Sequence, residues 1–231
     1  MSGPLPVKKF IETQLIRWQT ARRGLPAESK PEPVICISRL PGCDGGGLGQ
    51  ELAKRLKFDF FDRELLHHVA QSARLSETIV KTVDEKTASA VEEWVDSLFS
   101  QRFLSGDYLR HLSKVLMTIA HHGRAVILGR GAGYVLRHEQ CLRIGLVAPF
   151  EERVKAMASR DGLSHEEAQR RVVQLESERR AFIQHDFHVD MLDATHYDLL
   201  VNTAGLDRET ILAAILAAWE GKRKHAPTAA R

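Results

Sequence analysis

Short runs of consecutive apolar residues recur along the chain from position 34 onward. Because these runs are continuous rather than alternating, they predict strands covered on both faces, as in a parallel sheet. Five strands are expected, at Val34–Ser38, Lys57–Phe61, Ala125–Leu128, Leu142–Val147 and Leu199–Val201. Helical patterns separate them, at Leu48–Leu56, Phe150–Arg160 and Asp207–Trp219, the last with Asp207 as N-cap. This alternation predicts a doubly wound α/β fold with helices on both faces of the sheet.

Two helical stretches are longer than a simple crossover between parallel strands requires. The first, residues 63–123, lies between the second and third strands. The second, residues 161–190, is rich in arginine and contains the capping box Ser164-His165-Glu166-Glu167, which marks a helix start. We therefore expect one domain at residues 31–222 that carries two insertions, followed by a disordered tail at 223–231.

Residues 1–30 form a separate helical appendage. Ile11, Leu15 and Trp18 fall on one helical face among basic residues, and prolines at 26, 31 and 33 mark the linker that follows. Such a helix either touches an acidic membrane surface or packs on its own domain or on a partner subunit. A contact with a second copy or a partner through this segment is left open.

Composition excludes several classes of function. The 231 residues are 43% hydrophobic and 27% charged, as in ordinary globular proteins, and the net charge of +3 is too small to indicate nucleic-acid binding. No apolar run approaches the ~20 residues that a transmembrane helix needs. The three cysteines fit no metal-binding spacing and indicate a reducing cytoplasm. No metal site is predicted, since His185 and His188 with two nearby aspartates form an incomplete set of ligands.

A glycine-rich loop joins the first strand to the first long helix. Its residues are Gly42, Cys43, Asp44, Gly45, Gly46, Gly47, Leu48, Gly49 and Gln50. Such a turn directs backbone N–H groups and a helix N-terminus at one spot, which suits a phosphate, whereas a plain flexible turn needs fewer glycines. The spacing of Gly42 and Gly47 matches the motif G-x-x-x-x-G-K-[ST]. Leu48 replaces its lysine and Gly49 its hydroxyl, and Cys43 is either an activated thiol or an ordinary loop residue.

Arginines could substitute for the missing lysine, because a guanidinium can bind phosphate oxygens in a bidentate manner. Arg39 precedes the loop, and Arg179 and Arg180 lie on the arginine-rich helix, where pairing with Glu176 is the alternative for one of them. Arg130 lies between two glycines at the end of the third strand, where open α/β sheets bind ligands.

The end of the second strand carries a further pair of polar residues. Asp62 and Arg63 follow it directly. Asp62 is either the N-cap of the next helix or a residue that contacts substrate or Mg²⁺.

These segments resemble the cytidylate kinase-like family, a branch of the P-loop nucleoside monophosphate kinases, from about Val34 to Ala218. The matching segments are Ile37-Ser38-Arg39, Gly42 through Gly49, Phe60 through Leu65, Val126 through Gly131 and Tyr197 through Asn202. The resemblance implies a P-loop NTPase-type sheet, a monophosphate-binding insertion at 63–123 and an arginine-rich lid at 161–190. It implies ATP and Mg²⁺ as cofactors. In true cytidylate kinases the positions of Leu48 and Gln50 are lysine and threonine, and Asp44 and Asp62 are the candidates to compensate.

The expected activity is transfer of the γ-phosphoryl group of ATP to a nucleoside monophosphate, CMP or dCMP by resemblance. The residues expected to act on the transferred group are Arg39, Arg130, Arg179 and Arg180, and those expected to hold the acceptor are Asp62, Arg63 and Arg130. Two alternatives are a nucleotide-binding sensor or scaffold that has lost catalysis, and a kinase for another small acceptor.

Overall fold

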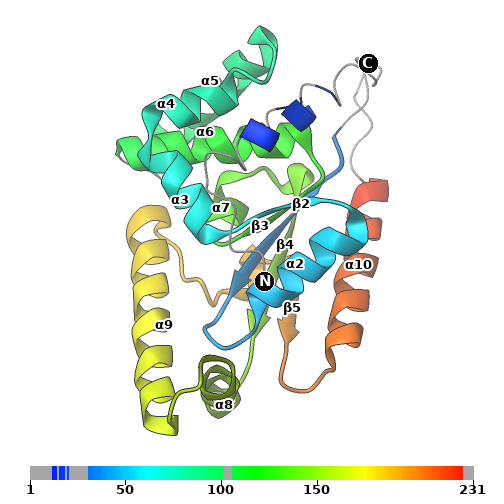
Figure 1. Ribbon diagram of the computed structural model, residues 1–231. Helices are drawn as coiled ribbons and strands as arrows, with labels where there is room; N and C mark the ends of the chain where they lie inside the picture. The colour runs from blue at the N-terminus through cyan, green and yellow to red at the C-terminus, as the bar shows by residue number, and fades with distance from the viewer. Residues whose placement is uncertain (1–11, 15, 19, 21–30, 101–105, 226–231) are drawn as a thin grey trace.

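The computed structural model describes residues 12–14, 16–18, 20, 31–100 and 106–225. Its centre is a five-stranded parallel sheet in the order β2-β3-β1-β4-β5. The strands are β1 Val34–Arg39, β2 Asp59–Phe61, β3 Ala125–Leu128, β4 Cys141–Val147 and β5 Leu199–Asn202. The predicted fold class is thus confirmed (Figure 1). The predicted start of β2 at Lys57 is wrong, because Lys57 has a φ of 55° and ends the preceding helix with its N–H bonded to the carbonyls of Ala53 and Lys54.

Strand β1 lies between β3 and β4, so the strand order reverses beside it, and its carboxyl end is the usual place for a ligand crevice. Helices α2 (Gly45–Leu56) and α10 (Arg208–His225) cover one face of the sheet, and α7 (Ala132–Val135) packs on β1 and β4 from the other. Alternate side chains of β1 point to opposite faces of the sheet. Ile37 contacts the start of α2, whereas Cys36 and Ser38 face the opposite side.

Helix α2 begins three residues before the predicted start at Leu48, so the glycines form its first turn. Asp44 caps it: its φ is 46°, and its carboxylate accepts a hydrogen bond from the N–H of Gly47 at 3.2 Å. The glycine-rich segment is therefore mostly the opening turn of a helix.

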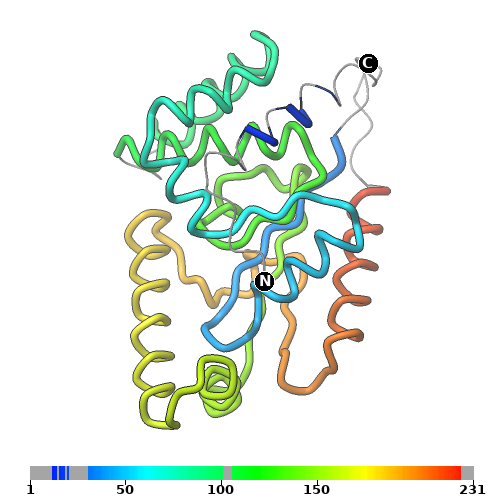
Figure 2. The backbone as a smooth tube through the Cα atoms, viewed as in Figure 1, coloured from blue at the N-terminus to red at the C-terminus, as the bar shows by residue number. Residues whose placement is uncertain are grey.

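The long insertion is helical throughout its described part, with α3 Arg63–Gln71, α4 Ala73–Val80, α5 Glu85–Ser100 and α6 Asp107–His122. Asp62 caps α3, since its carboxylate accepts from the N–H of Leu65 at 2.8 Å. The predicted helix at Phe150–Arg160 is α8 Phe150–Asp161, and the predicted lid at 161–190 is mainly α9 His165–Phe187, whose opening capping box is formed. Figures 1 and 2 show α3 and α9 on the side of the molecule where β1 ends.

The C-terminal helix differs from its predicted boundaries. Asp207 caps α10 by accepting from the N–H of Thr210 at 2.8 Å, as predicted, but the helix continues past Trp219 to His225. Residues 223–225 are therefore helical rather than part of a disordered tail, and 226–231 lie outside the described residues.

The described part of the N-terminal appendage packs on its own domain. The ring of Trp18, 7% exposed, stacks on that of His122 with centroids 4.3 Å apart. Arg17 pairs with Asp59 at 2.8 Å, which ties the segment to the start of β2. Ile11 and Leu15, expected on the same face as Trp18, lie outside the described residues. No helix in the described part of the chain is long and apolar enough to span a bilayer.

Candidate functional site

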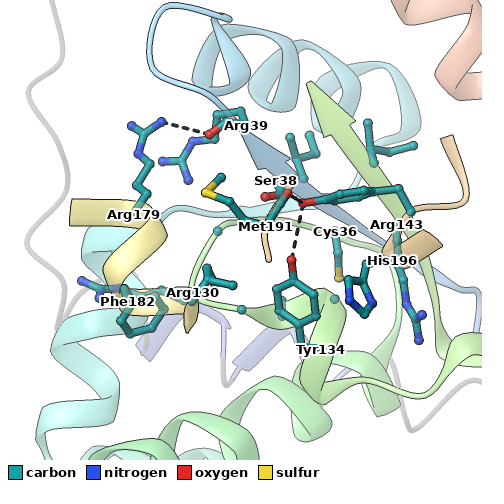
Figure 3. A pocket seen from close by; sticks show the side chains of 18 of the residues that line it. Cys36, Ser38, Arg39, Arg130, Tyr134, Arg143, Arg179, Phe182, Met191 and His196 are labelled. Carbon is teal, nitrogen blue, oxygen red and sulfur yellow. Dashed lines mark hydrogen bonds between the residues drawn. The ribbon is translucent and has the colours of Figure 1, made fainter. Parts of the chain in front are cut away.

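A cavity of about 240 Å³ lies at the carboxyl ends of β1 and β3, between α9 and the segment that follows β3 (Figure 3). Its wall carries a group of arginines, namely Arg39, Arg63, Arg130, Arg143 and Arg179. Glu178 is the one acidic residue among the described residues that line it. A partly enclosed space with this excess of positive charge is suited to an anionic ligand.

Arg39 connects the glycine loop to this cavity. Its side-chain stem lies against Gly45, where a Cβ atom would come 2.9 Å from Cγ of Arg39. Its guanidinium reaches the end of β3, where a Cβ atom on Gly129 would come 2.6 Å from Nη1. The absence of a Cβ atom at both positions leaves room for this side chain, and Arg39 extends from one candidate site to the other.

The other arginines are held by backbone carbonyls rather than by carboxylates. Arg179 donates from Nη1 to the carbonyl of Arg39 at 3.1 Å (Figure 3). Arg130 donates from Nε to the carbonyl of Arg63 at 3.3 Å and lies over the ring of Phe182 at 5.5 Å. Among the described residues, the buried Nε of Arg179 has no hydrogen-bond partner. These groups thus keep N–H donors and positive charge for a ligand.

Burial and mutual repulsion lower the pKa values of three of these arginines. Burial, followed by the charges of Arg179, Arg63 and Arg130, lowers the pKa of Arg39 to about 9. Burial, followed by the charge of Arg63, lowers the pKa of Arg179 to about 10. Burial also lowers the pKa of Arg130. An anion bound among them would offset both effects, which favours a doubly charged group such as phosphate.

The structure brings together four of the residues that the sequence selected, Arg39, Arg63, Arg130 and Arg179. It does not bring Arg180 to this cavity. The Arg180 guanidinium lies 3.9 Å from Glu176 on the same helix, its side chain is 50% exposed, and it lines a separate groove. The reason is helix geometry, because successive residues point about 100° apart. Helix-surface pairing, the alternative stated above, therefore describes Arg180.

The glycine loop lies beside this cavity rather than in its wall. Leu48, at the position of the missing lysine, is 2% exposed and packs in the core. Cys43 is equally buried, and burial raises the pKa of its thiol, so it is not an activated nucleophile. Gly49 allows close packing, since a Cβ there would come 2.7 Å from the ring of Phe60. Part of the glycine pattern therefore serves packing, while Gly46 has open space around it.

Two acidic residues of the loop region are already engaged. The Asp44 carboxylate pairs with Arg208, at the start of α10. The Asp62 carboxylate caps α3, and its charge acts on Arg39. Within the described residues, no group of three or more His, Cys, Asp or Glu side chains is placed to hold a metal ion. With glycine at the motif's hydroxyl position and both aspartates engaged, the residues present do not fit a magnesium ion held by the protein itself.

A second groove, of about 580 Å³, lies between α3, α6 and α9 and shares Arg130 and Phe182 with the cavity. Polar side chains line the rest of it, among them His67, Gln71, Asp107, Tyr108, His111 and Asp186. His67 and Tyr108 are joined by a hydrogen bond of 3.2 Å, and burial together with Arg130 lowers the pKa of His67. The arrangement can hold a polar ring system attached to a phosphate at Arg130.

Sequence reasoning missed several residues of these sites. Phe182 follows Arg179 by three positions on α9, a spacing that could have identified it as a neighbour. Tyr134 follows the glycine-flanked Arg130 by four positions. Arg208 carried no signal, because its meeting with Asp44 joins positions 164 residues apart.

Comparison with known proteins identifies a family model, relatives and a solved structure that are similar to this chain. A family model described as the cytidylate kinase-like family matches residues 34–205. A cytidylate kinase from Thermococcus kodakarensis is 33% identical over 185 residues, which cover 80% of this chain and 86% of the relative. One from Ignicoccus hospitalis is 30% identical over 182 residues, which cover 79% and 96%. The structure of an uncharacterized protein from Eubacterium ventriosum aligns with a TM-score of 0.58 at 16% identity, over 82% of this chain and 99% of that one, which shows a shared fold.

Proposed function

The chain belongs to the cytidylate kinase-like family, and we propose that it transfers the γ-phosphoryl group of ATP to a pyrimidine nucleoside monophosphate. Its α/β fold is that of P-loop kinases, and it is a nucleoside monophosphate kinase-like enzyme. CMP and dCMP are the acceptors proposed, on the name shared by its relatives.

The observation that carries this proposal is the cluster of arginines in the cavity, none of which forms a salt bridge with a carboxylate in the described part of the chain. The acceptor's phosphate binds among Arg63, Arg130 and Arg179, and the resulting ion pairs replace like-charge repulsion with attraction. The nucleoside extends into the adjoining groove, where Gln71 and Asp107 offer the amide and carboxylate groups that can read a base edge.

ATP binds at the N-terminus of α2, with its γ-phosphate directed toward Arg39. An oxygen of the acceptor's phosphate attacks the γ-phosphorus, the bond from that phosphorus to the β,γ-bridging oxygen breaks, and ADP departs with the bonding electrons. The chain's own contribution is to position the two nucleotides and to neutralise charge on the transferred group. Arg39 suits this role because it extends from Gly45 to Gly129, between donor and acceptor. Mg²⁺ enters only as part of the ATP complex.

The test is ATP consumption by the full chain with each nucleoside monophosphate in turn. We expect turnover with CMP or dCMP, and Arg130→Met should raise the acceptor's KM at least about tenfold while leaving the KM for ATP unchanged. Arg171→Met is the matched control, because Arg171 lies on the exposed surface of α9. Absence of turnover with every monophosphate would contradict the proposal.

One observation favours a second candidate, a nucleotide-binding sensor. Leu48 is buried in the core, and the carboxylate of Asp44 stands at the helix N-terminus where a phosphate is expected. ATP binding without turnover of any acceptor would support this reading, and turnover of one acceptor would exclude it.

A further inference from the structure

The glycine loop already holds an anion, and the anion is its own Asp44. One carboxylate oxygen accepts the Gly47 N–H at 3.2 Å, and the other pairs with Nη1 of Arg208. A guanidinium nitrogen of Arg208 lies over the helix start, 3.0 Å from where a Cβ atom on Gly47 would be. A backbone N–H and a guanidinium converging on one negative group are the donors that bind a phosphate oxygen.

Four other arginines near the loop are engaged elsewhere, and one of them, Arg179, donates to the carbonyl of Arg39 and lines the cavity. Arg39 points to the end of β3, and Arg153 binds the carbonyls of Pro41 and Ala148 together with Glu176. Arg160 pairs with Asp161 through two hydrogen bonds. In the described part of the chain, Arg208 is thus the guanidinium that faces the solvent side of the loop, and its side chain is 49% exposed.

We propose that Arg208 binds the donor's phosphates in place of the lysine that the loop lacks, and that Asp44 holds Arg208 in position until the donor arrives. This inference rests on the proposed function, because it takes the triphosphate to bind at the loop. The triphosphate and the Asp44 carboxylate compete for the same guanidinium and the same N–H. Binding of the donor therefore displaces the carboxylate and transfers Arg208 to a phosphate.

The start of α10 gives Arg208 a fixed place. Glu209 forms two hydrogen bonds with Arg55 of α2, at 2.6 and 2.7 Å, and Asp207 caps the helix. Arg208 lies outside residues 34–205, the part that the family model matches, and none of the segments that carry the family resemblance contains it.

The test is titration of the full chain with the β,γ-imido analogue of ATP and Mg²⁺, by calorimetry and without acceptor. Arg208→Ala should weaken binding about tenfold or more, and Arg208→Lys should recover part of the loss. Asp44→Asn keeps the cap and tolerates the left-handed backbone, so it should tighten binding severalfold. That gain should vanish in the Arg208→Ala background, since the two residues act on the same ligand.

Arg223→Ala is the matched control, because it removes a guanidinium of similar exposure from the other end of α10, where Arg223 pairs with Glu32 and Glu220. Equal binding by wild type and Arg208→Ala, or an equal loss in Arg223→Ala, would overturn the inference. Weaker binding by Asp44→Asn would overturn the competition between carboxylate and phosphate. Wild-type chain that turns over no acceptor contradicts the proposed function instead, and the isotherms still decide the role of Arg208.

Discussion

Replacing Arg179 by methionine should make the unliganded protein more stable while weakening acceptor binding. Arg179 contributes to the cavity a charge that burial and Arg63 disfavour, and it adds to the repulsion on Arg39. Methionine is similar in length and fills the same space without charge. Stability and function therefore oppose each other at this position, as expected where like charges are gathered for a ligand.

The magnitude follows from the pKa of Arg179, lowered from 12.5 to about 10. At about 1.36 kcal/mol per pKa unit, the buried charge costs at most about 3 kcal/mol. Its hydrogen bond to the carbonyl of Arg39, at 3.1 Å, stabilises by about 1–2 kcal/mol and is lost in the variant. The net gain expected is about 1–2 kcal/mol, which raises the Tm of a chain of this size by about 2–8 °C.

The assay is thermal unfolding in a buffer free of phosphate and sulfate, repeated with CMP. Without ligand the Arg179→Met protein should melt higher than wild type, and with CMP its gain in Tm should be smaller than that of wild type. Arg180→Met serves as the control, since Arg180 is half exposed and outside the cavity. If Arg179→Met melts lower than wild type without ligand, the repulsion argument is refuted. An undiminished response to CMP would refute the binding role.

Two further predictions concern the loop and the end of β3. Leu48→Lys should destabilise the fold by about 3 kcal/mol or more and should not raise activity, because Leu48 is 2% exposed and the ammonium would be buried. Urea unfolding and a kinase assay check this, with Leu48→Met as the control. A Leu48→Lys enzyme more active than wild type would contradict the prediction. Gly131→Ala should destabilise by about 2–4 kcal/mol, because φ is +67° and a Cβ would come 2.1 Å from the ring of Phe187. Gly133→Ala, which meets its nearest neighbour at 3.6 Å, is the tolerated comparison, and equal urea midpoints for the two variants would argue against the clash.

The burial of Leu48 bears on whether a lysine at this position would improve phosphate binding. From the motif alone, Leu48→Lys would be expected to strengthen the binding of phosphate to the loop. The structure shows that α2 starts at Gly45, which turns Leu48 toward the core. We therefore propose that another cation serves the loop, with Arg208 as the candidate.

The sheet and several of the helix starts could be predicted from the sequence. Continuous apolar runs separated by helical patterns are sufficient to predict a parallel α/β sheet, since few other folds bury such strands on both faces. The caps at Ser164 and Asp207 were equally readable, because a cap bonds to a backbone group two or three residues away. Arg39 and Arg130 could be selected because each stands at the end of a strand, where ligands bind.

The tertiary structure alone decided which charged groups share one space. Neither the position of Arg179 inside the cavity nor that of Arg180 outside it follows from composition, because one step along a helix changes the face. The pairing of Asp44 with Arg208 joins residues 164 positions apart and carries no local signal. Local patterns record backbone geometry within a few residues, whereas a binding site depends on distances between segments that only packing brings together.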